Sequence, residues 1–399
     1  MFYKLILLGA LSFFGLAHSE TLTYSKIPLD KYLEIVKENN ALIRSSKLDV
    51  QTASANKESQ SLYKFNPSVS YTRGSWNTQV PYAPYTSPQS STYAFNFSIE
   101  GWGKRSARAN LAESQITASD SQLKSTSSSI ETTAFNAYID SLRLALLDKS
   151  YGNALSKLTS IKANPKLADS VRFLQYYQGA TQKDLMFSSL SLLNYSGKAL
   201  KDLPYPMGNL NYPPQNLIAD NLVEQAQSNR VDVLALQAAI DVADKNVTLT
   251  NQNRNIDLAP YVSQTRTPQY VDSGATYTAQ NSVSAGVTIP IPVNNFLQTA
   301  DIVQAANQKL QYEMQLEDLK VQIRVQVLQA FLQYSAAKDV LANAQADYDG
   351  VVKNPNKDPV QAVMDMRDKE GSLLDAKTNH LKALIYLWRQ SGNYTVPNL

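Results

Sequence analysis

Residues 67–73 read PSVSYTR and residues 260–266 read PYVSQTR, so one short phrase occurs twice, 193 positions apart, with five of seven residues identical. Upstream of these phrases the offset becomes 190 and pairs Asn39 with Asn229. A change of three positions is the size of a small insertion. The pattern predicts an internal tandem duplication, joined near the proline-rich stretch 203–214, where four prolines exclude a continuous helix.

Each copy has the same expected order: a helix, a strand hairpin, a very long helix, a tight turn and a returning helix. The first repeat spans residues 20–200, with a helix from Leu29 to Lys64, a hairpin at about 67–100, a long helix at about 104–163 and a returning helix at about 168–200. The second spans residues 216–391, with a helix at 221–252, a hairpin at about 260–291, a long helix at about 295–353 and a returning helix at about 358–390. We expect residues 201–215 to form an equatorial linker between the two repeats, and residues 392–399 to form a C-terminal tail.

Two segments of about ten residues alternate between apolar and small polar side chains, which is typical of a strand between two unlike media. Their length matches a tilted transmembrane β-strand, although a half-buried strand of a soluble sheet gives the same alternation. We expect the apolar side chains to face lipid. They are Tyr93, Phe95, Phe97 and Ile99 in the first copy and Val283, Val287 and Ile289 in the second.

The long helices are expected from two proline-free runs of roughly 60 residues, each about 90 Å long as a helix. In the second run, apolar residues from Leu316 to Leu341 recur every three or four positions, as in a coiled coil. The stretch VQIRVQV (321–327) also alternates like a strand, but no turn signal bounds it, and a helix is favoured. Both runs end at Asn-Pro. We expect the helices to end there, because the residue before a proline is disfavoured in a helix.

Residues 1–19 combine Lys4, an apolar run from Leu5 to Leu16 and small residues before the end, which is typical of a secretory signal peptide. The mature sequence has no apolar run of the ~18 residues that a transmembrane helix needs. There is no cysteine, and His380 is the one histidine left after the signal is removed. We expect no catalytic, cofactor or metal site, and so no enzyme.

Four strands cannot close a barrel, and an open sheet edge in lipid leaves costly unpaired backbone groups. Closure therefore requires further chains. Two copies would give eight strands, and three would give twelve, enough to begin holding water.

The hairpin followed by GWGKRSARANLAESQ (101–115) and a long helix, together with NRVDVLALQAAIDVADKNV (229–247), resembles the TolC-type outer-membrane efflux family. The resemblance covers about residues 27–391. It implies an α+β membrane protein: a homotrimer with a 12-stranded β-barrel, four strands per protomer, in the outer membrane of a Gram-negative bacterium. A long α-helical barrel would continue it into the periplasm.

The resemblance also implies a function. Such channels bind a periplasmic adaptor protein and an inner-membrane pump, and serve as the exit duct for drugs, metal ions or secreted proteins. Their periplasmic entrance is closed at rest. Two alternatives stay open: the outer-membrane component of a type I protein secretion system, and a soluble periplasmic coiled-coil scaffold.

The periplasmic tip is the expected adaptor-docking region, although its Asn-Pro pairs depart from the glycine-containing turn expected in the family. The docking candidates are Asn164, Pro165, Asn354, Pro355 and Lys357. In a trimer, Asp358 or Asp365 would form an entrance ring of like charges that selects cations. Alternatively, Asp358 is simply an acid favoured at a helix N-terminus. At the other end of the long helix, Lys104, Arg105 and Arg108 would contact lipid phosphates or remain solvated.

Overall fold

The computed structural model describes residues 23–64, 66–75, 89–161, 166–197, 200–272, 275–290 and 299–397. The chain divides into two compact units. One, here called the helical unit, comprises Met1–Ser45, Lys124–Arg230 and Val321–Leu399. The other, the sheet unit, comprises Ser46–Leu123 and Val231–Lys320.

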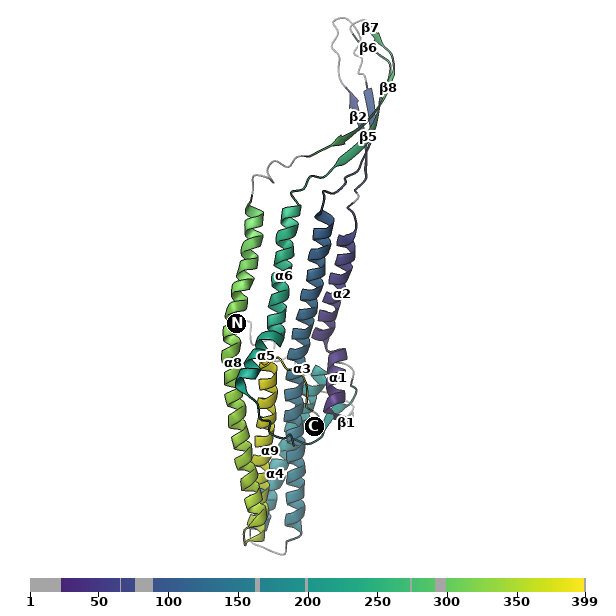
Figure 1. Cartoon of the computed structure of the whole chain (residues 1–399). Coiled ribbons are helices and arrows are strands. Elements are labelled where there is room, and N and C mark those ends of the chain that lie inside the picture. Colours follow the sequence, from purple (N-terminus) through teal and green to yellow (C-terminus); the bar gives the residue numbers. More distant parts are fainter. Residues whose placement is uncertain are drawn as a thin grey trace, which may run out of the picture. The chain divides into compact units, whose positions relative to one another are not determined.

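The sheet unit contains one antiparallel sheet of four strands, in the order β2-β3-β5-β8. Its strands are β2 (Ser68–Ser75), β3 (Gln89–Asn96), β5 (Ala259–Thr267) and β8 (Gln280–Thr288). A separate small hairpin, β6 (Tyr270–Asp272) with β7 (Ala275–Tyr277), lies between β5 and β8 in sequence. The same unit holds most of α2 (Ala41–Ser61), all of α6 (Val231–Gln252) and the first parts of α3 (Lys104–Thr159) and α8 (Ala300–Lys353) (Figure 1).

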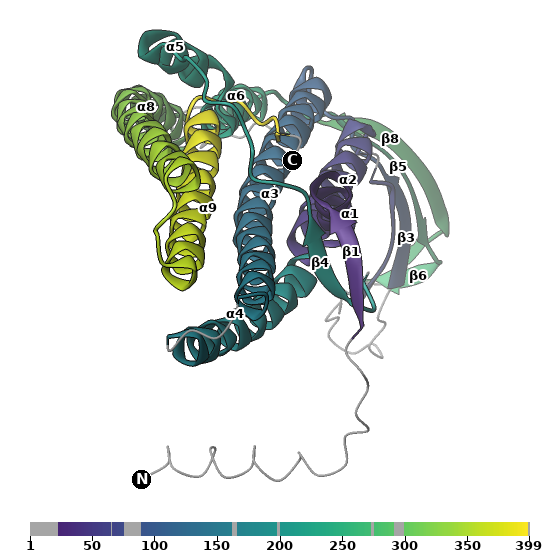
Figure 2. The ribbon, with the colours of Figure 1, turned by 90° about the horizontal axis from the view of Figure 1, so that it is seen from below.

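The helical unit contains α1 (Leu29–Asn39), α4 (Leu167–Tyr195), α5 (Ala219–Asn229), α9 (Pro359–Gln390) and the remaining parts of α3 and α8. In this unit α9 lies beside α8, and α4 lies beside α3 (Figures 1 and 2). No helix among the described residues combines the length and the apolar character that a membrane crossing requires.

The three-and-four spacing in the second long helix is reflected in its burial. Ile323, Val327 and Ala330 are fully buried, whereas Val321 and Val325 on the opposite side are exposed. The stretch 321–327, whose alternation also fits a strand, lies inside α8. Helical periodicity explains both patterns at once, because residues three and four apart share one face of a helix.

The single helices expected at 29–64 and 221–252 are wrong, because each is broken near its start. Asn40 between α1 and α2, and Arg230 between α5 and α6, have extended backbones, with ψ of 130° and 136°. The Asn40 side chain accepts the Leu42 N–H at 3.0 Å and donates to the Tyr195 carbonyl at 3.1 Å. Asn40 therefore caps the second helix and ties the break to the end of α4.

A glycine at the end of each returning helix packs against these breaks. Gly197 (φ 66°) follows α4, and Gly392 (φ 77°) follows α9. A Cβ on Gly197 would lie 2.9 Å from the Asn39 carbonyl oxygen, and a Cβ on Gly392 would lie 3.0 Å from the Arg230 nitrogen. Glycine is required at both positions because the backbone is left-handed and the neighbouring chain is too close for a side chain.

We expect Gly197→Ala to destabilise the protein by about 1–3 kcal/mol, since it combines a left-handed backbone with a backbone clash. The matched control is Gly179→Ala, in the interior of α4, where a Cβ would meet nothing within 4 Å. That substitution should stabilise by about 0.5–1 kcal/mol, because alanine favours a helix over glycine. Equilibrium unfolding followed by circular dichroism measures both. Equal effects of the two substitutions would contradict the packing described for Gly197.

A small parallel sheet, which the sequence did not predict, joins the start of the chain to the linker. It pairs β1 (Tyr24–Pro28) with β4 (Leu203–Met207). The buried Tyr138 of α3 holds both strands. Its hydroxyl accepts the Met207 N–H at 2.9 Å and lies 2.8 Å from the carbonyl oxygens of Ile27 and Met207. Burial raises the pKa of Tyr138 to about 12, so the hydroxyl stays protonated and able to donate.

Candidate pore elements: the sheet face and the helical tip

In two neighbouring rows, the register of the four-stranded sheet collects mostly apolar side chains on one face, with Gln264 as the polar exception. Val69, Phe95, Val262 and Ala285 lie in one row across the strands, and Tyr71, Tyr93, Gln264 and Val283 lie in the next row on that face. The opposite face carries rows of small and mostly polar residues: Ser70, Ala94, Ser263 and Ser284, then Thr72, Thr92, Thr265 and Ser282. Adjacent residues in a strand point to opposite faces, so one register sets the character of both.

The apolar face is exposed in the single chain. Six of the seven residues expected to face lipid have exposed fractions between 42% and 72%, and the seventh, Phe97, is half-buried. Tyr71 and Tyr93 pack against each other with their ring centroids 4.9 Å apart. A contiguous apolar face of this kind is rare on soluble monomers and indicates contact with lipid or another apolar surface.

Three of the predicted strand residues lie just outside the regular strands, which corrects the expected strand ends. Phe97 and Ile99 follow β3, which ends at Asn96, and Ile289 follows β8, which ends at Thr288. The Phe97 N–H donates to the Pro260 carbonyl at 3.2 Å, but Pro260 has no N–H to donate back, so the ladder is interrupted. Pairing resumes only as an isolated bridge between Ile99 and Leu258.

The sheet has two open edges. Among the described residues, β2 pairs only with β3, and β8 pairs only with β5. An edge strand presents unpaired N–H and C=O groups that another chain can complete. Strands of other chains can therefore pair with the sheet at both of its edges.

The three cations after the first hairpin contact the protein itself. Lys104 forms an ion pair with Asp257 at 2.8 Å, and Arg108 forms one with Glu100. Arg105 donates to the Ser61 carbonyl at 2.7 Å and lies over the Tyr63 ring. The sequence did not predict these contacts within the protein. Contact of the same cations with lipid phosphates stays a prediction, and Arg105 is also exposed to solvent.

At the tip, α8 ends at Lys353, directly before Asn354 and Pro355. Asn354, Pro355 and Lys357 are all exposed. The corresponding candidates of the first turn, Asn164 and Pro165, lie outside the described residues.

Asp358 is the N-cap of α9. Its Oδ1 accepts the Val360 N–H at 3.0 Å, with Pro359 at the first helical position. Its Oδ2 lies 3.4 Å from the Lys166 ammonium, which links the two turns of the tip. Sequence reasoning did not single out Lys166, because this ion pair joins residues 192 positions apart. Asp365 accepts hydrogen bonds from Gln361 at 2.7 Å and Asn356 at 3.2 Å. Both candidate ring carboxylates are thus engaged in holding the turn.

The first turn of α9 should loosen in acid. The Val360 N–H holds the pKa of the Asp358 carboxyl below its ordinary value of 3.8, and Lys166 adds to this effect. A carboxyl with a lowered pKa in the folded chain stabilises the fold above its unfolded pKa, and this contribution is lost as the pH falls through the folded pKa. Hydrogen exchange of residues 358–362, corrected for intrinsic rates, should accelerate below about pH 4. Asp358→Asn keeps the cap but cannot titrate, so an unchanged acid response in that variant would contradict the assignment.

Behind the turns, an apolar cluster joins α3, α4 and α9. Its buried members are Tyr151, Ala154, Leu158, Leu174 and Val360. Arg367 lies over the Tyr151 ring, with its guanidinium carbon 3.9 Å from the ring centroid. The cluster and this cation–π contact fix the returning helices close to the tip.

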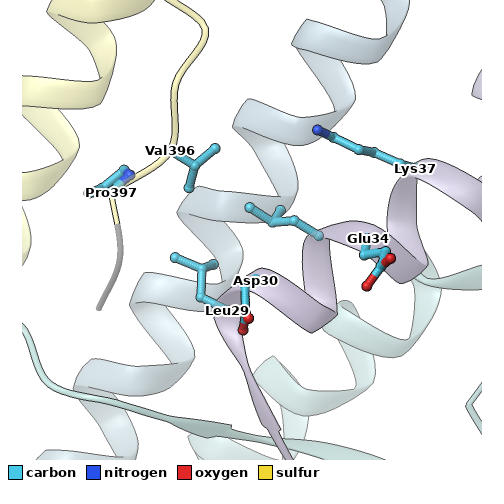
Figure 3. Close-up of a pocket in the computed structure, with 7 residues that line it drawn as sticks. Leu29, Asp30, Glu34, Lys37, Val396 and Pro397 are labelled. Atoms are coloured by element: carbon cyan, nitrogen blue, oxygen red, sulfur yellow. The ribbon is translucent and has the colours of Figure 1, made fainter.

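A pocket of about 480 Å³ lies where the C-terminal segment passes α1. Leu29 and Val396 gather between the two segments, and Asp30, Glu34 and Lys37 line the same pocket (Figure 3). Charges of both signs line it, so no ligand class is singled out. Within the described residues, no group of three or more metal-ligating side chains occurs.

Solved structures similar to this chain include outer-membrane channels. OprN is 12% identical with a TM-score of 0.63, over 92% of this chain and 90% of its own. CmeC of Campylobacter jejuni is 14% identical with a TM-score of 0.61, over 91% and 85%. CusC, whose structures describe transmembrane channel formation, is 13% identical with a TM-score of 0.62, over 96% of both chains.

The chain has the fold of the TolC-type outer-membrane channels. The resemblance found in the sequence is confirmed at the level of fold, along more than nine-tenths of the chain. No protein-family model matches the sequence, and none of the curated proteins compared with it matches.

Proposed function

We propose that this protein is an outer-membrane channel that serves as the exit duct of a tripartite efflux system. Three copies would assemble through their sheet edges into a 12-stranded barrel, and their long helices would form a tunnel through the periplasm. Residues 1–19 would direct export as a cleaved signal peptide. A periplasmic adaptor and an inner-membrane pump would complete the system.

The observation that carries this proposal is the four-stranded sheet with one apolar face and two open edges. Lipid tolerates a sheet only when no edge is left unpaired, so four strands require partners. A barrel of twelve strands turns the apolar face outward to lipid and the serine and threonine rows inward to water. The neighbours OprN, CmeC and CusC, which are channels of the same fold, support this arrangement.

The two repeats would have arisen by tandem duplication. The equivalent helix breaks at Asn40 and Arg230 support this, as do the left-handed glycines that pack on them, Gly197 and Gly392. Duplication gives each protomer two equivalent hairpins and two equivalent helix pairs. A trimer would then have six similar wall segments, which is how a threefold assembly could form a near-uniform tunnel.

The tip would be both the docking region and the gate. Asn354, Pro355 and Lys357, with Asn164 and Pro165 of the other turn, would contact the adaptor. Asp358 and Asp365 remain candidates for an entrance ring. Their bonds to Val360, Lys166, Gln361 and Asn356 mean that such a ring would share its carboxylates with the turn.

Cell fractionation tests the proposal. We expect the protein in the outer membrane, extractable only with detergent, and trimeric by chemical cross-linking. A soluble monomer would overturn the channel and favour the scaffold alternative. Deletion strains then separate the two channel functions, because loss of drug or metal-ion resistance indicates efflux and loss of an exported protein indicates type I secretion.

A further inference from the structure

The linker after β4 runs along α8 and α9 as an ordered strap. The Tyr334 hydroxyl accepts the Gln215 N–H at 2.6 Å, and the buried Leu210 anchors the other end. Tyr212 packs edge-on against Trp388, with ring centroids 6.1 Å apart. These contacts all lie within the helical unit, so they fix the strap on its own helices.

Between the strap and the two helices is a pocket of about 530 Å³. Its lining is mostly apolar, and it is within the volume range of sites for small organic molecules. Leu210 to Pro214 line one side, and Lys338, Leu341, Ala342, Gln345 and Lys377 line the other.

Two ammonium groups belong to this apolar wall. Lys377 donates to the Asn211 side-chain oxygen at 2.7 Å, and Lys338 donates to the Asn216 side-chain oxygen at 3.0 Å. Both lysines are half-buried, and among the described lining residues none is acidic. Burial also lowers the pKa of Lys377, although the charge of Glu370 acts in the opposite direction.

This arrangement differs from that of two other lysines of the same helices, which contact carboxylates. Lys382 contacts Asp140 at 2.6 Å, and Lys369 contacts Asp347 at 2.6 Å. A neutral amide oxygen compensates a half-buried ammonium less well than a carboxylate does, because charge-assisted bonds are roughly twice as strong. The pocket therefore offers two incompletely compensated cations beside apolar surface.

We propose that this pocket binds a small amphipathic anion, an organic carboxylate or sulfonate with an aromatic or alkyl body. The acid group would replace amide oxygens as the partner of Lys338 and Lys377, and the body would lie against Leu341, Pro213 and Pro214. The site lies beside the linker. It contains no residue of the four-stranded sheet or of the tip turns. It does not depend on the channel function.

Calorimetric titration of the detergent-extracted protein with 4-phenylbutyrate tests the proposal, with protein-free micelles as the blank. The matched probe is 4-phenylbutanamide, which has the same body without the charge. We expect the acid to bind about tenfold more tightly than the amide. Lys338→Met and Lys377→Met should each weaken binding of the acid by about tenfold and leave binding of the amide unchanged.

Two further variants distinguish a specific loss of the binding site from a general folding defect. Lys353→Met, at the exposed end of α8, removes the same charge elsewhere and should bind the acid as the parent protein does. Ala342→Phe fills the pocket without changing its charge and should weaken binding of both probes. Equal binding of acid and amide, or unchanged binding by the lysine variants, would overturn the proposal. So would an absence of binding by the assembled protein, which would indicate that a neighbouring copy covers the pocket.

Discussion

Val262→Arg is expected to abolish the outer-membrane form of the protein. Val262 is in the central strand β5, on the apolar face between Phe95 and Ala285, and half of its surface is exposed. Arginine on the lipid face of a barrel costs about 2–4 kcal/mol at the bilayer midplane. A trimer would incur roughly three times this cost, because each protomer carries the substitution. Western blotting of outer-membrane fractions measures the surviving trimer.

The matched control is the next residue, Ser263, which lies on the opposite face beside Ala94 and Ser284. Ser263→Arg introduces the same charge into the same strand. It should leave trimer and membrane insertion largely intact, because it faces the proposed water-filled interior. Equal loss of the protein in both variants would contradict the assignment of the two faces.

The second large effect is expected at Tyr138. Tyr138→Ala removes a fully buried ring that packs 5.5 Å from the Tyr32 ring, and it leaves the Met207 N–H without its partner. We expect a loss of about 3–5 kcal/mol in unfolding free energy. Tyr138→Phe keeps the ring but not the hydrogen bonds, and should cost about 1–3 kcal/mol.

Denaturant unfolding followed by circular dichroism at 222 nm measures these losses. Tyr176→Ala is the matched control, since Tyr176 is exposed on α4 and its removal should change stability by at most about 0.5 kcal/mol. If Tyr138→Ala behaves like Tyr176→Ala, then Tyr138 does not anchor the β1–β4 sheet.

The features that the sequence predicted depend on short-range periodicity. Alternation around Tyr93 and Val283 indicated the two faces of the strands, because the period of two is a local property of extended chain. Ile323 and Val327 indicated the buried seam of α8 for the same reason, with a helical period. The expectation of a trimer came from the resemblance to a known family, because the periodicity of the sequence does not indicate the number of copies.

The features that were missed depend on contacts between distant residues. Nothing beside Asn40 is a proline or glycine, and its break is fixed by Tyr195 and Gly197, about 155 positions away. The β1–β4 sheet pairs Tyr24 with Leu203, and both of its strands contain proline, a residue that is depleted in strands. Such tertiary contacts override local propensity and leave no periodic signal in the sequence.

Cysteine cross-linking between the two sheet edges tests the assembly most directly. The chain has no cysteine, so a pair can be introduced without background. Three double variants would each combine Ser284→Cys in β8 with one substitution in β2: Ser68→Cys, Ser70→Cys or Thr72→Cys. Together they cover the possible registers between the two edges. In one protomer three strand spacings, roughly 14 Å, separate β2 from β8. This exceeds the ~7 Å limit between the Cα atoms of a disulfide, so only separate copies can cross-link.

Closure by three copies predicts that at least one double variant gives reductant-sensitive dimers and trimers in the outer membrane, whereas each single variant gives no trimer. Monomers alone from every double variant, in membranes that contain the protein, would contradict a barrel closed between β2 of one copy and β8 of the next.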